Sequence, residues 1–193
     1  MAARSDGARH VYLVRHGQTA LNAEGRLRGL SNAPLDETGI AEARNLAGVF
    51  ATKRPSIVVS SPLERAVHTA RLFADAAGAA RWVDEHFNDR DYGPQTGQLK
   101  AEVIARWGTV DDAPGVEPAA DVLARARPAL DALLDDAQGG SVIVVTHDAV
   151  IRPLIASIDP AKTDLDAPTG SWNDLCRTNG IWSVLTTDQK PGA

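Results

Sequence analysis

Two runs of mainly apolar residues indicate buried strands, and each run is followed directly by a histidine. Residues 11–14 lead into Arg15 and His16, and residues 142–146 lead into His147. Apolar runs of this length are typical of strands buried on both faces of a sheet. Because open α/β folds bind ligands at the edge where parallel strands end, we expect both imidazoles to lie at that edge.

Two amphipathic helices, with a short strand between them, are predicted after the first apolar run. The first helical pattern opens at residues 36–39, with acids suited to a first turn, and a short buried strand over residues 56–60 follows it. Pro62 begins the next predicted helix, in which Arg65 and Thr69 share a side other than the apolar face. The apolar faces of the two helices are Ile40, Ala43, Ala47 and Phe50, and Leu63, Ala66, Val67, Ala70 and Phe73.

The second half of the chain predicts one long helix and a late strand. Apolar positions keep helical spacing over residues 117–137, but Pro128 lies inside the run and predicts a kink or a break. Residues 171–187 hold no helical period, and residues 181–185 suit a strand near the sheet edge. The alternation of strands and helices predicts a three-layer α/β/α sandwich with a mostly parallel central sheet.

Length and composition fit one domain with a small partner. The chain of 193 residues, 44% of them hydrophobic, can bury one sizeable core, so a single domain over residues 1–193 is expected, with loose termini at 1–9 and 188–193. The formal net charge is −5, from 25 acidic and 20 basic residues mixed along the chain. This balance argues against nucleic acid or an anionic membrane as the main partner.

Cysteine content and hydropathy point to a cytoplasmic protein. Cys176 is the one cysteine and cannot form an internal disulfide, and the first ten residues carry no apolar run that resembles a signal peptide. No window approaches the roughly 18 consecutive apolar residues of a membrane span. The apolar edge over residues 172–185 is compatible with a homodimer.

The residues around His16 favour phosphate chemistry. A neutral imidazole can attack phosphorus, and the guanidinium of Arg15 offers planar, permanently charged donors to phosphoryl oxygens. Arg65 projects from the first turn of a predicted helix, which is itself a favourable place for an anion. His147 would add a second donor, so that two arginines and two histidines spread charge over the transferring phosphoryl group.

Four motifs, in this order along the chain, are shared with one enzyme family. They are Leu13-Val14-Arg15-His16-Gly17-Gln18-Thr19 with Asn22, Ser60-Ser61-Pro62-Leu63-Glu64-Arg65-Ala66, Phe87-Asn88-Asp89-Arg90-Asp91-Tyr92-Gly93 and Val144-Val145-Thr146-His147. Through them residues 11–185 resemble the histidine phosphatase superfamily of phosphoglycerate mutases and small phosphatases. The resemblance implies a phosphoglycerate mutase-like fold and a transient phosphohistidine on His16.

The same resemblance implies roles for further residues. Arg15, Arg65 and His147 would form the phosphate pocket, and Asn22 would also contact the phosphoryl group. Lys100 stands where the mutases carry a carboxylate-binding lysine. The predicted substrate-binding residues are Gln18, Thr19, Asn22, Tyr92 and Lys100.

The proton donor for the leaving oxygen is expected to be Asp89. The family normally has a glutamate here, and aspartate is shorter by one methylene, or about 1.5 Å. Asp148 is the alternative acid, because it follows His147 as in the His-Asp pair of the superfamily's other branch. The sequence Asp-Arg-Asp-Tyr-Gly favours Asp89. Either carboxyl must be protonated when the alcohol departs, which needs a raised pKa.

Hydrolysis of a phosphate monoester is the predicted function, and a small phosphorylated molecule is the expected partner. Mutases of this type are longer and shield their phosphohistidine, whereas the span over residues 92–117 offers little lid, and only Arg106 is basic between Lys100 and Gly115. Mutase-type transfer and a non-catalytic phospholigand binder are the alternatives. Phosphohistidine chemistry needs no metal or other cofactor, so none is predicted. Arg26 and Arg28 fit either extra phosphate contacts or a solvated surface.

Overall fold

The computed structural model describes residues 7–136 and 139–192, and its centre is a six-stranded sheet. The strand order is β3-β2-β4-β1-β5-β6. The first four strands in this order are parallel, and β5 pairs antiparallel with both β1 and β6. The strands are β1 (Arg9–Arg15), β2 (Pro55–Ser60), β3 (Ala80–Val83), β4 (Ser141–Thr146), β5 (Trp172–Thr178) and β6 (Ile181–Gln189).

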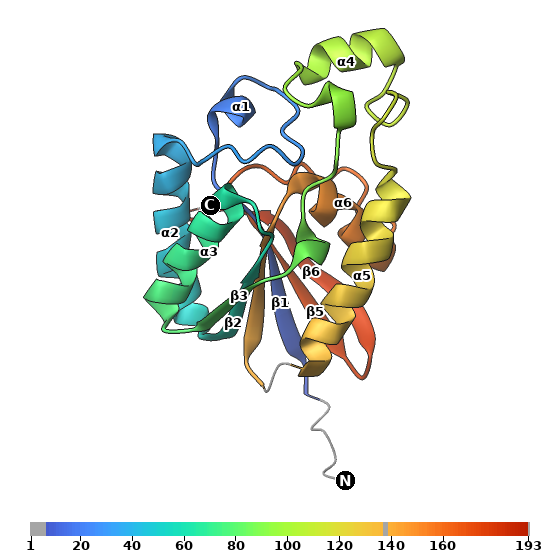
Figure 1. Ribbon diagram of the computed structural model, residues 1–193. Helices are drawn as coiled ribbons and strands as arrows, with labels where there is room; N and C mark the ends of the chain where they lie inside the picture. The colour runs from blue at the N-terminus through green and yellow to red at the C-terminus, as the bar shows by residue number, and fades with distance from the viewer. Residues whose placement is uncertain (1–6, 137–138, 193) are drawn as a thin grey trace.

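Helices cover both faces of the sheet. Figure 1 shows α2 and α3 on one face and α5 and α6 on the other, with α1 and α4 beyond the edge at which β1 ends. This arrangement confirms the predicted α/β fold with a mostly parallel sheet. The helices are α1 (Ala20–Ala23), α2 (Glu37–Lys53), α3 (Glu64–Ala77), α4 (Lys100–Trp107), α5 (Ala119–Asp136) and α6 (Asp148–Ile158), and two 3₁₀ turns are η1 (Glu85–Phe87) and η2 (Gly93–Gln95).

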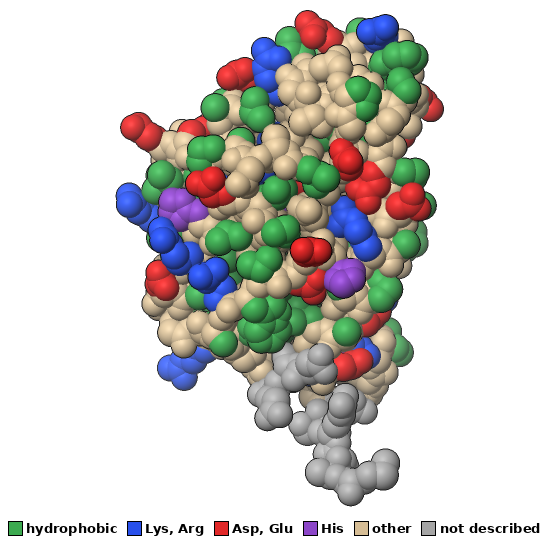
Figure 2. Space-filling view, viewed as in Figure 1, with side chains coloured by type: hydrophobic (Ala, Val, Ile, Leu, Met, Phe, Trp, Pro, Cys, Tyr) green, Lys and Arg blue, Asp and Glu red, His purple; other side chains and the backbone are tan. Residues whose placement is uncertain are grey.

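The surface carries both signs of charge. On the face shown in Figure 2, acidic and basic side chains both occur over the helices, interspersed with apolar ones. Within the described residues, no helix is both long enough and apolar enough to cross a membrane.

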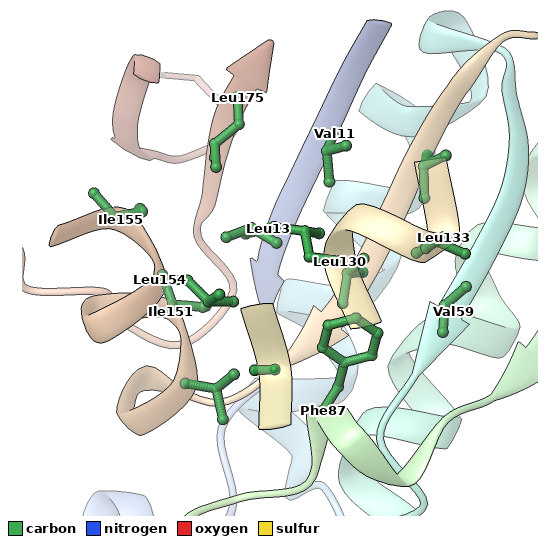
Figure 3. Packing of buried hydrophobic residues seen from close by; sticks show 14 of the residues in the cluster. Val11, Leu13, Val59, Phe87, Leu130, Leu133, Ile151, Leu154, Ile155 and Leu175 are labelled. Carbon is green, nitrogen blue, oxygen red and sulfur yellow. The ribbon is translucent and has the colours of Figure 1, made fainter. Parts of the chain in front are cut away.

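The two faces of the sheet bury two separate apolar clusters, because successive strand residues point to opposite sides. In β1, Tyr12 and Val14 pack toward α2 and α3, while Val11 and Leu13 pack toward α5 and α6. Figure 3 shows the cluster on the side of α5 and α6, with Leu130 of α5 among the strand side chains. Burial on both faces therefore explains why the apolar runs are continuous. The ends of these runs coincide with the ends of β1 and β4.

Three details of the predicted elements are wrong. Of the kink or break predicted at Pro128, the break is wrong, because helix α5 continues through the proline and core side chains on either side hold it against the sheet. The helix after β2 begins at Glu64 instead of Pro62, with Leu63 as its N-cap. The stretch from residue 171 forms two strands, not one, and includes an antiparallel hairpin.

The termini are partly ordered. Residues 1–6 of the predicted loose leader lie outside the described residues, but Arg9 already belongs to β1. The predicted loose tail is wrong at its start, because β6 runs to Gln189. The Asp188 carboxylate accepts hydrogen bonds from the main-chain N–H groups of Asp166 and Ala167, at 3.0 and 2.9 Å. These bonds tie β6 to the loop before β5.

The segment between Asp89 and α5 is more structured than the sequence predicted. It contains η2 and α4, and its Tyr92, Val103 and Ala113 form a small buried cluster with Leu27 of the loop after α1. A bridge between Arg26 and Leu99 joins it to the loop after α1. The segment therefore forms a fixed wall above the strand ends, where little lid was expected.

Candidate active site

His16 and His147 leave neighbouring strands at the same level. In the parallel pair of β1 and β4, Arg15 lies opposite Thr146, and the next residue on each strand is a histidine. The main-chain N–H of His16 donates to the Thr146 carbonyl at 3.2 Å. The two imidazoles are fully buried, and their ring centres lie 5.0 Å apart. The structure thus brings together the two histidines on which the sequence prediction depended.

The imidazole of His16 presents an unprotonated nitrogen to the site. Its Nδ1 lies 2.6 Å from the Gly17 carbonyl, which can only accept, so Nδ1 carries the proton. Its Nε2 accepts a hydrogen bond from Nε of Arg65 at 3.2 Å. Burial, followed by the positive charge of Arg65, lowers the pKa of His16 well below its ordinary value. The ring is therefore neutral at pH 7, with its Nε2 lone pair directed at Arg65.

Arg65 organises the centre of the site from the first turn of α3. Its side chain is fully buried, and its Nη2 donates to Oδ2 of Asp89 at 2.9 Å. The same guanidinium donates to the carbonyls of Gly29 and Ser31, at 2.9 and 2.7 Å. Arg65 therefore joins the nucleophile candidate, the acid candidate and the loop after α1.

Asp89 lies on a loop that is held from behind. Its side chain is fully buried, and its Oδ1 accepts from the main-chain N–H of Arg90 at 2.8 Å. Burial raises the pKa of Asp89 above its ordinary value, although Arg65 acts against this shift. On the far side of the loop, Arg125 of α5 donates to the carbonyls of Asn88 and Asp89, at 2.8 and 3.0 Å. A buried carboxyl with a raised pKa, held in place by Arg65 and Arg125, thus stands beside His16 and His147.

Asp148 has the opposite electrostatic character. Burial alone would raise the pKa of Asp148, but the guanidinium groups of Arg15 and Arg28 outweigh burial and hold it well below its ordinary value. Oδ1 of Asp148 lies 2.9 Å from Nη2 of Arg28 and 3.5 Å from Nη2 of Arg15. Asp148 is therefore an ionised carboxylate that binds two arginines. Arg28, left open by the sequence, is buried and belongs to the site.

A basic cavity of about 420 Å³ adjoins Arg15. Two residues predicted to bind substrate, Tyr92 and Lys100, line it. Tyr92 is buried in the wall, whereas Lys100 begins α4. The charged residues of the lining are Arg15, Arg26, Arg28, Arg90, Lys100, Arg152, Asp111 and Asp148. Six cations against two carboxylates favour an anionic occupant.

The remaining predicted substrate contacts serve local structure. Thr19 is the N-cap of α1, and Oδ1 of Asn22 accepts from its hydroxyl and its main-chain N–H, at 2.8 and 3.0 Å. Nε2 of Gln18 donates to Asp36 at 3.1 Å. These three residues do not line the basic cavity. Among the described residues, no group of three or more His, Cys, Asp or Glu side chains is arranged to hold a metal ion.

Two contacts that hold the site residues in place were not predicted from the sequence, and they are made by Arg125 and by Ser61. Arg125 lies on the polar side of a long helix, where a solvated arginine is the ordinary expectation, and its carbonyl partners are more than 35 residues away in sequence. The hydrogen bond between Ser61 and His147, 2.7 Å long, joins residues 86 positions apart. Neither contact has a local signal, because each depends on how the strands and α5 pack.

The chain belongs to the histidine phosphatase superfamily, branch 1, whose family model matches residues 11–190. The predicted family is therefore confirmed. Glucosyl-3-phosphoglycerate phosphatase of Mycobacterium tuberculosis is 30% identical over 204 residues, covering 96% of this chain and 89% of that protein. A 2,3-bisphosphoglycerate-dependent phosphoglycerate mutase of Methylobacterium sp. (strain 4-46) is 32% identical over 199 residues, covering 94% of this chain and 96% of that protein.

Solved structures show the same fold. The mycobacterial glucosyl-3-phosphoglycerate phosphatase in complex with VO3 matches with a TM-score of 0.86 at 27% identity, over 94% of this chain and 100% of that one. A phosphoglycerate mutase from Bacillus anthracis matches with a TM-score of 0.86 at 23% identity, over 95% of this chain and 94% of that one. The second match concerns the fold alone.

Proposed function

We propose that the protein is a phosphomonoesterase that transfers the phosphoryl group to Nε2 of His16 and then to water. The observation that carries this proposal is the neutral, buried imidazole of His16, whose unprotonated nitrogen faces Arg65. Arg15 precedes His16 at the end of β1, and the ring of His147 lies beside that of His16, so both side chains would stabilise the negative charge of the phosphoryl oxygens. Such a nucleophile needs no deprotonation before it attacks.

The proposed reaction has two balanced steps. In the first step, Nε2 of His16 bonds to phosphorus, the ester P–O bond breaks, and the leaving alkoxide takes the proton of Asp89. In the second step, water attacks phosphohistidine and gives a proton to the Asp89 carboxylate, so that inorganic phosphate leaves and His16 is regenerated. The raised pKa of Asp89 and the lowered pKa of Asp148 support Asp89 as the acid.

The experiment that tests this proposal is hydrolysis of p-nitrophenyl phosphate in the presence of EDTA between about pH 5 and pH 8, the range in which an imidazole titrates. We expect turnover by the wild type, loss of turnover in His16→Ala, and retained turnover in His68→Gln, whose histidine lies on α3 outside the site. Retained turnover in His16→Ala would refute the phosphohistidine route.

We further propose that the substrate carries a second anionic group beside the scissile phosphate. The six basic residues of the cavity support this, and so do relatives that are named for phosphoglycerate derivatives. We expect kcat/KM for 3-phosphoglycerate to exceed that for glycerol 3-phosphate by about tenfold, because one added ion pair to a cation contributes roughly 1.4 kcal/mol. Lys100→Met should remove most of this preference. Equal kcat/KM values of the wild type for the two esters would contradict the proposal of a second anionic group.

Mutase-type transfer is the second candidate function, favoured by the Methylobacterium relative. Release of inorganic phosphate and interconversion of 2- and 3-phosphoglycerate, measured in the same reaction, distinguish the two functions. The homodimer, the cytoplasmic location, the single domain and the absence of nucleic-acid binding stay predictions from the sequence.

A further inference from the structure

Ser61 and His147 meet because they follow neighbouring parallel strands. β2 and β4 pair with Ser60 opposite Val145, and the chain leaves β2 at Ser61 and β4 after Thr146. The main-chain N–H of Ser61 donates to the Val145 carbonyl at 3.1 Å, which fixes the serine at the end of the strand. Its Oγ then lies 2.7 Å from Nε2 of His147, and both residues are fully buried.

The other ring nitrogen of His147 faces the centre of the site. Nδ1 is buried and has no hydrogen-bond partner among the described residues. Oδ2 of Asp89 lies 3.6 Å from it, beyond an ordinary hydrogen bond, and the ring of His16 is 5.0 Å away between centres. An unpartnered buried nitrogen between the nucleophile and the acid is placed to meet a phosphoryl oxygen.

The environment decides which of the two nitrogens carries a proton. Burial, with Arg65 next, lowers the pKa of His147 well below its ordinary value, so the neutral ring holds one proton. With that proton on Nε2, the Nδ1 lone pair would face the oxygens of Asp89 and of the substrate, and acceptor would oppose acceptor. With the proton on Nδ1, the Ser61 hydroxyl donates to Nε2, and the Nδ1–H group faces those oxygens.

We propose that Ser61 is a positioning residue, which donates its hydroxyl hydrogen to Nε2 of His147 and thereby keeps Nδ1 protonated as a donor to the phosphoryl group. The part about the phosphoryl group rests on the proposed function, whereas the proton position does not. Both histidines then hold their proton on Nδ1, but they direct different ring nitrogens at the substrate. His16 offers a lone pair to phosphorus, and His147 offers an N–H to oxygen.

Nuclear magnetic resonance tests the proton position without any turnover. Two-bond 1H–15N correlation spectra of the ¹⁵N-histidine-labelled protein, at pH 7.5 and without phosphate, report which nitrogen of each ring is protonated; His147→Gln assigns the signals. We expect Nδ1–H for His147 in the wild type and a shift toward Nε2–H in Ser61→Ala. Ser60→Ala is the matched control, because Ser60 is the adjacent buried serine and its Oγ has no hydrogen-bond partner in the described part of the chain. An Nε2–H ring in the wild type, or an unchanged ring in Ser61→Ala, would overturn the proposal.

Kinetics provide the second readout. Loss of one donor to a developing oxyanion lowers kcat by about 10²–10³, and a mixture of tautomers keeps part of that donor, so we expect Ser61→Ala to lose at least about tenfold in kcat/KM for p-nitrophenyl phosphate. Ser61→Thr, which restores the hydroxyl, should recover most of the loss, and Ser60→Ala should stay within about twofold. Equal activity of Ser61→Ala and Ser60→Ala would contradict the role of Ser61, even if the phosphatase activity itself is found.

Discussion

Replacement of Asp89 by asparagine separates the acid role from the structural role of this side chain. Asparagine has the size of aspartate and its one amide oxygen can still accept from Arg65, although its NH2 group replaces the oxygen that faces the main-chain N–H of Arg90, and it cannot deliver a proton. Alanine is the wrong variant, because it would leave the buried Nη2 of Arg65 without its acceptor at Asp89, at a cost of about 1–3 kcal/mol. Asp89→Asn therefore tests chemistry in a folded protein.

The expected size of the effect depends on the leaving group. General acid catalysis contributes about 10²–10⁴ in rate, which corresponds to about 2.7–5.4 kcal/mol of barrier. For an alkyl phosphate, whose alkoxide needs the proton of Asp89, we expect kcat of Asp89→Asn to fall by that factor. For p-nitrophenyl phosphate, whose phenolate leaves unprotonated, phosphorylation of His16 should slow by less than about tenfold. Hydrolysis of the phosphohistidine then becomes rate-limiting, so stopped-flow absorbance should show a burst of nitrophenolate equal to the enzyme concentration.

Asp148→Asn is the matched control. Asp148 is already ionised, and asparagine can still accept the hydrogen bond from Arg28, so both substrates should lose a similar and small factor. The reasoning is refuted if Asp148→Asn shows the leaving-group dependence and Asp89→Asn does not.

Three further predictions concern stability and positioning. Gly39→Ala should lower the unfolding free energy by about 1–3 kcal/mol, because a Cβ there meets the main chain after the nucleophile, whereas Gly48→Ala on the open side of the same helix should raise it by about 0.5–1 kcal/mol; thermal melts of the pair decide this. Because the pKa values of His16 and His147 are lowered in the folded protein, only the unfolded state takes up protons on these residues as the pH falls below about 6.5. The urea midpoint of unfolding should therefore be lower at pH 5.5 than at pH 7.5. The difference between the two midpoints should shrink in the double variant His16→Gln/His147→Gln. Arg125→Met frees the loop of the acid, so kcat for alkyl phosphates should fall about tenfold and kcat for aryl phosphates much less, and equal losses would contradict a positioning role.

Residues whose position depends on the local chain were predictable. The apolar runs before His16 and His147 determine where β1 and β4 end, and parallel pairing then places both rings at one edge. Arg65 was predictable for a similar reason, because a helix start after a buried strand aims its first turn at that edge. The position of Asp89 came from the family pattern, and its burial and pairing with Arg65 had no sequence signal.

Some misses had a signal and others had none. The hairpin between β5 and β6 turns at Asn179 and Gly180, both with positive φ, and Asn-Gly is a strong hairpin signal. A break, one of the two outcomes predicted at Pro128, does not occur, because the buried side chains of α5 offset the roughly 3 kcal/mol that a proline costs inside a helix. The short strand β3 is exposed along its length and so carries no apolar period.

Detection of the phosphoenzyme tests the central claim most directly. The wild-type protein is mixed with p-nitrophenyl phosphate, quenched within milliseconds under alkaline denaturing conditions that preserve phosphohistidine, digested, and analysed by mass spectrometry. We predict one phosphoryl group on the peptide that contains His16, absent from His16→Ala and accumulated in Asp89→Asn. A phosphoryl group on another residue, or turnover without any phosphoenzyme and undiminished in His16→Ala, would contradict the account.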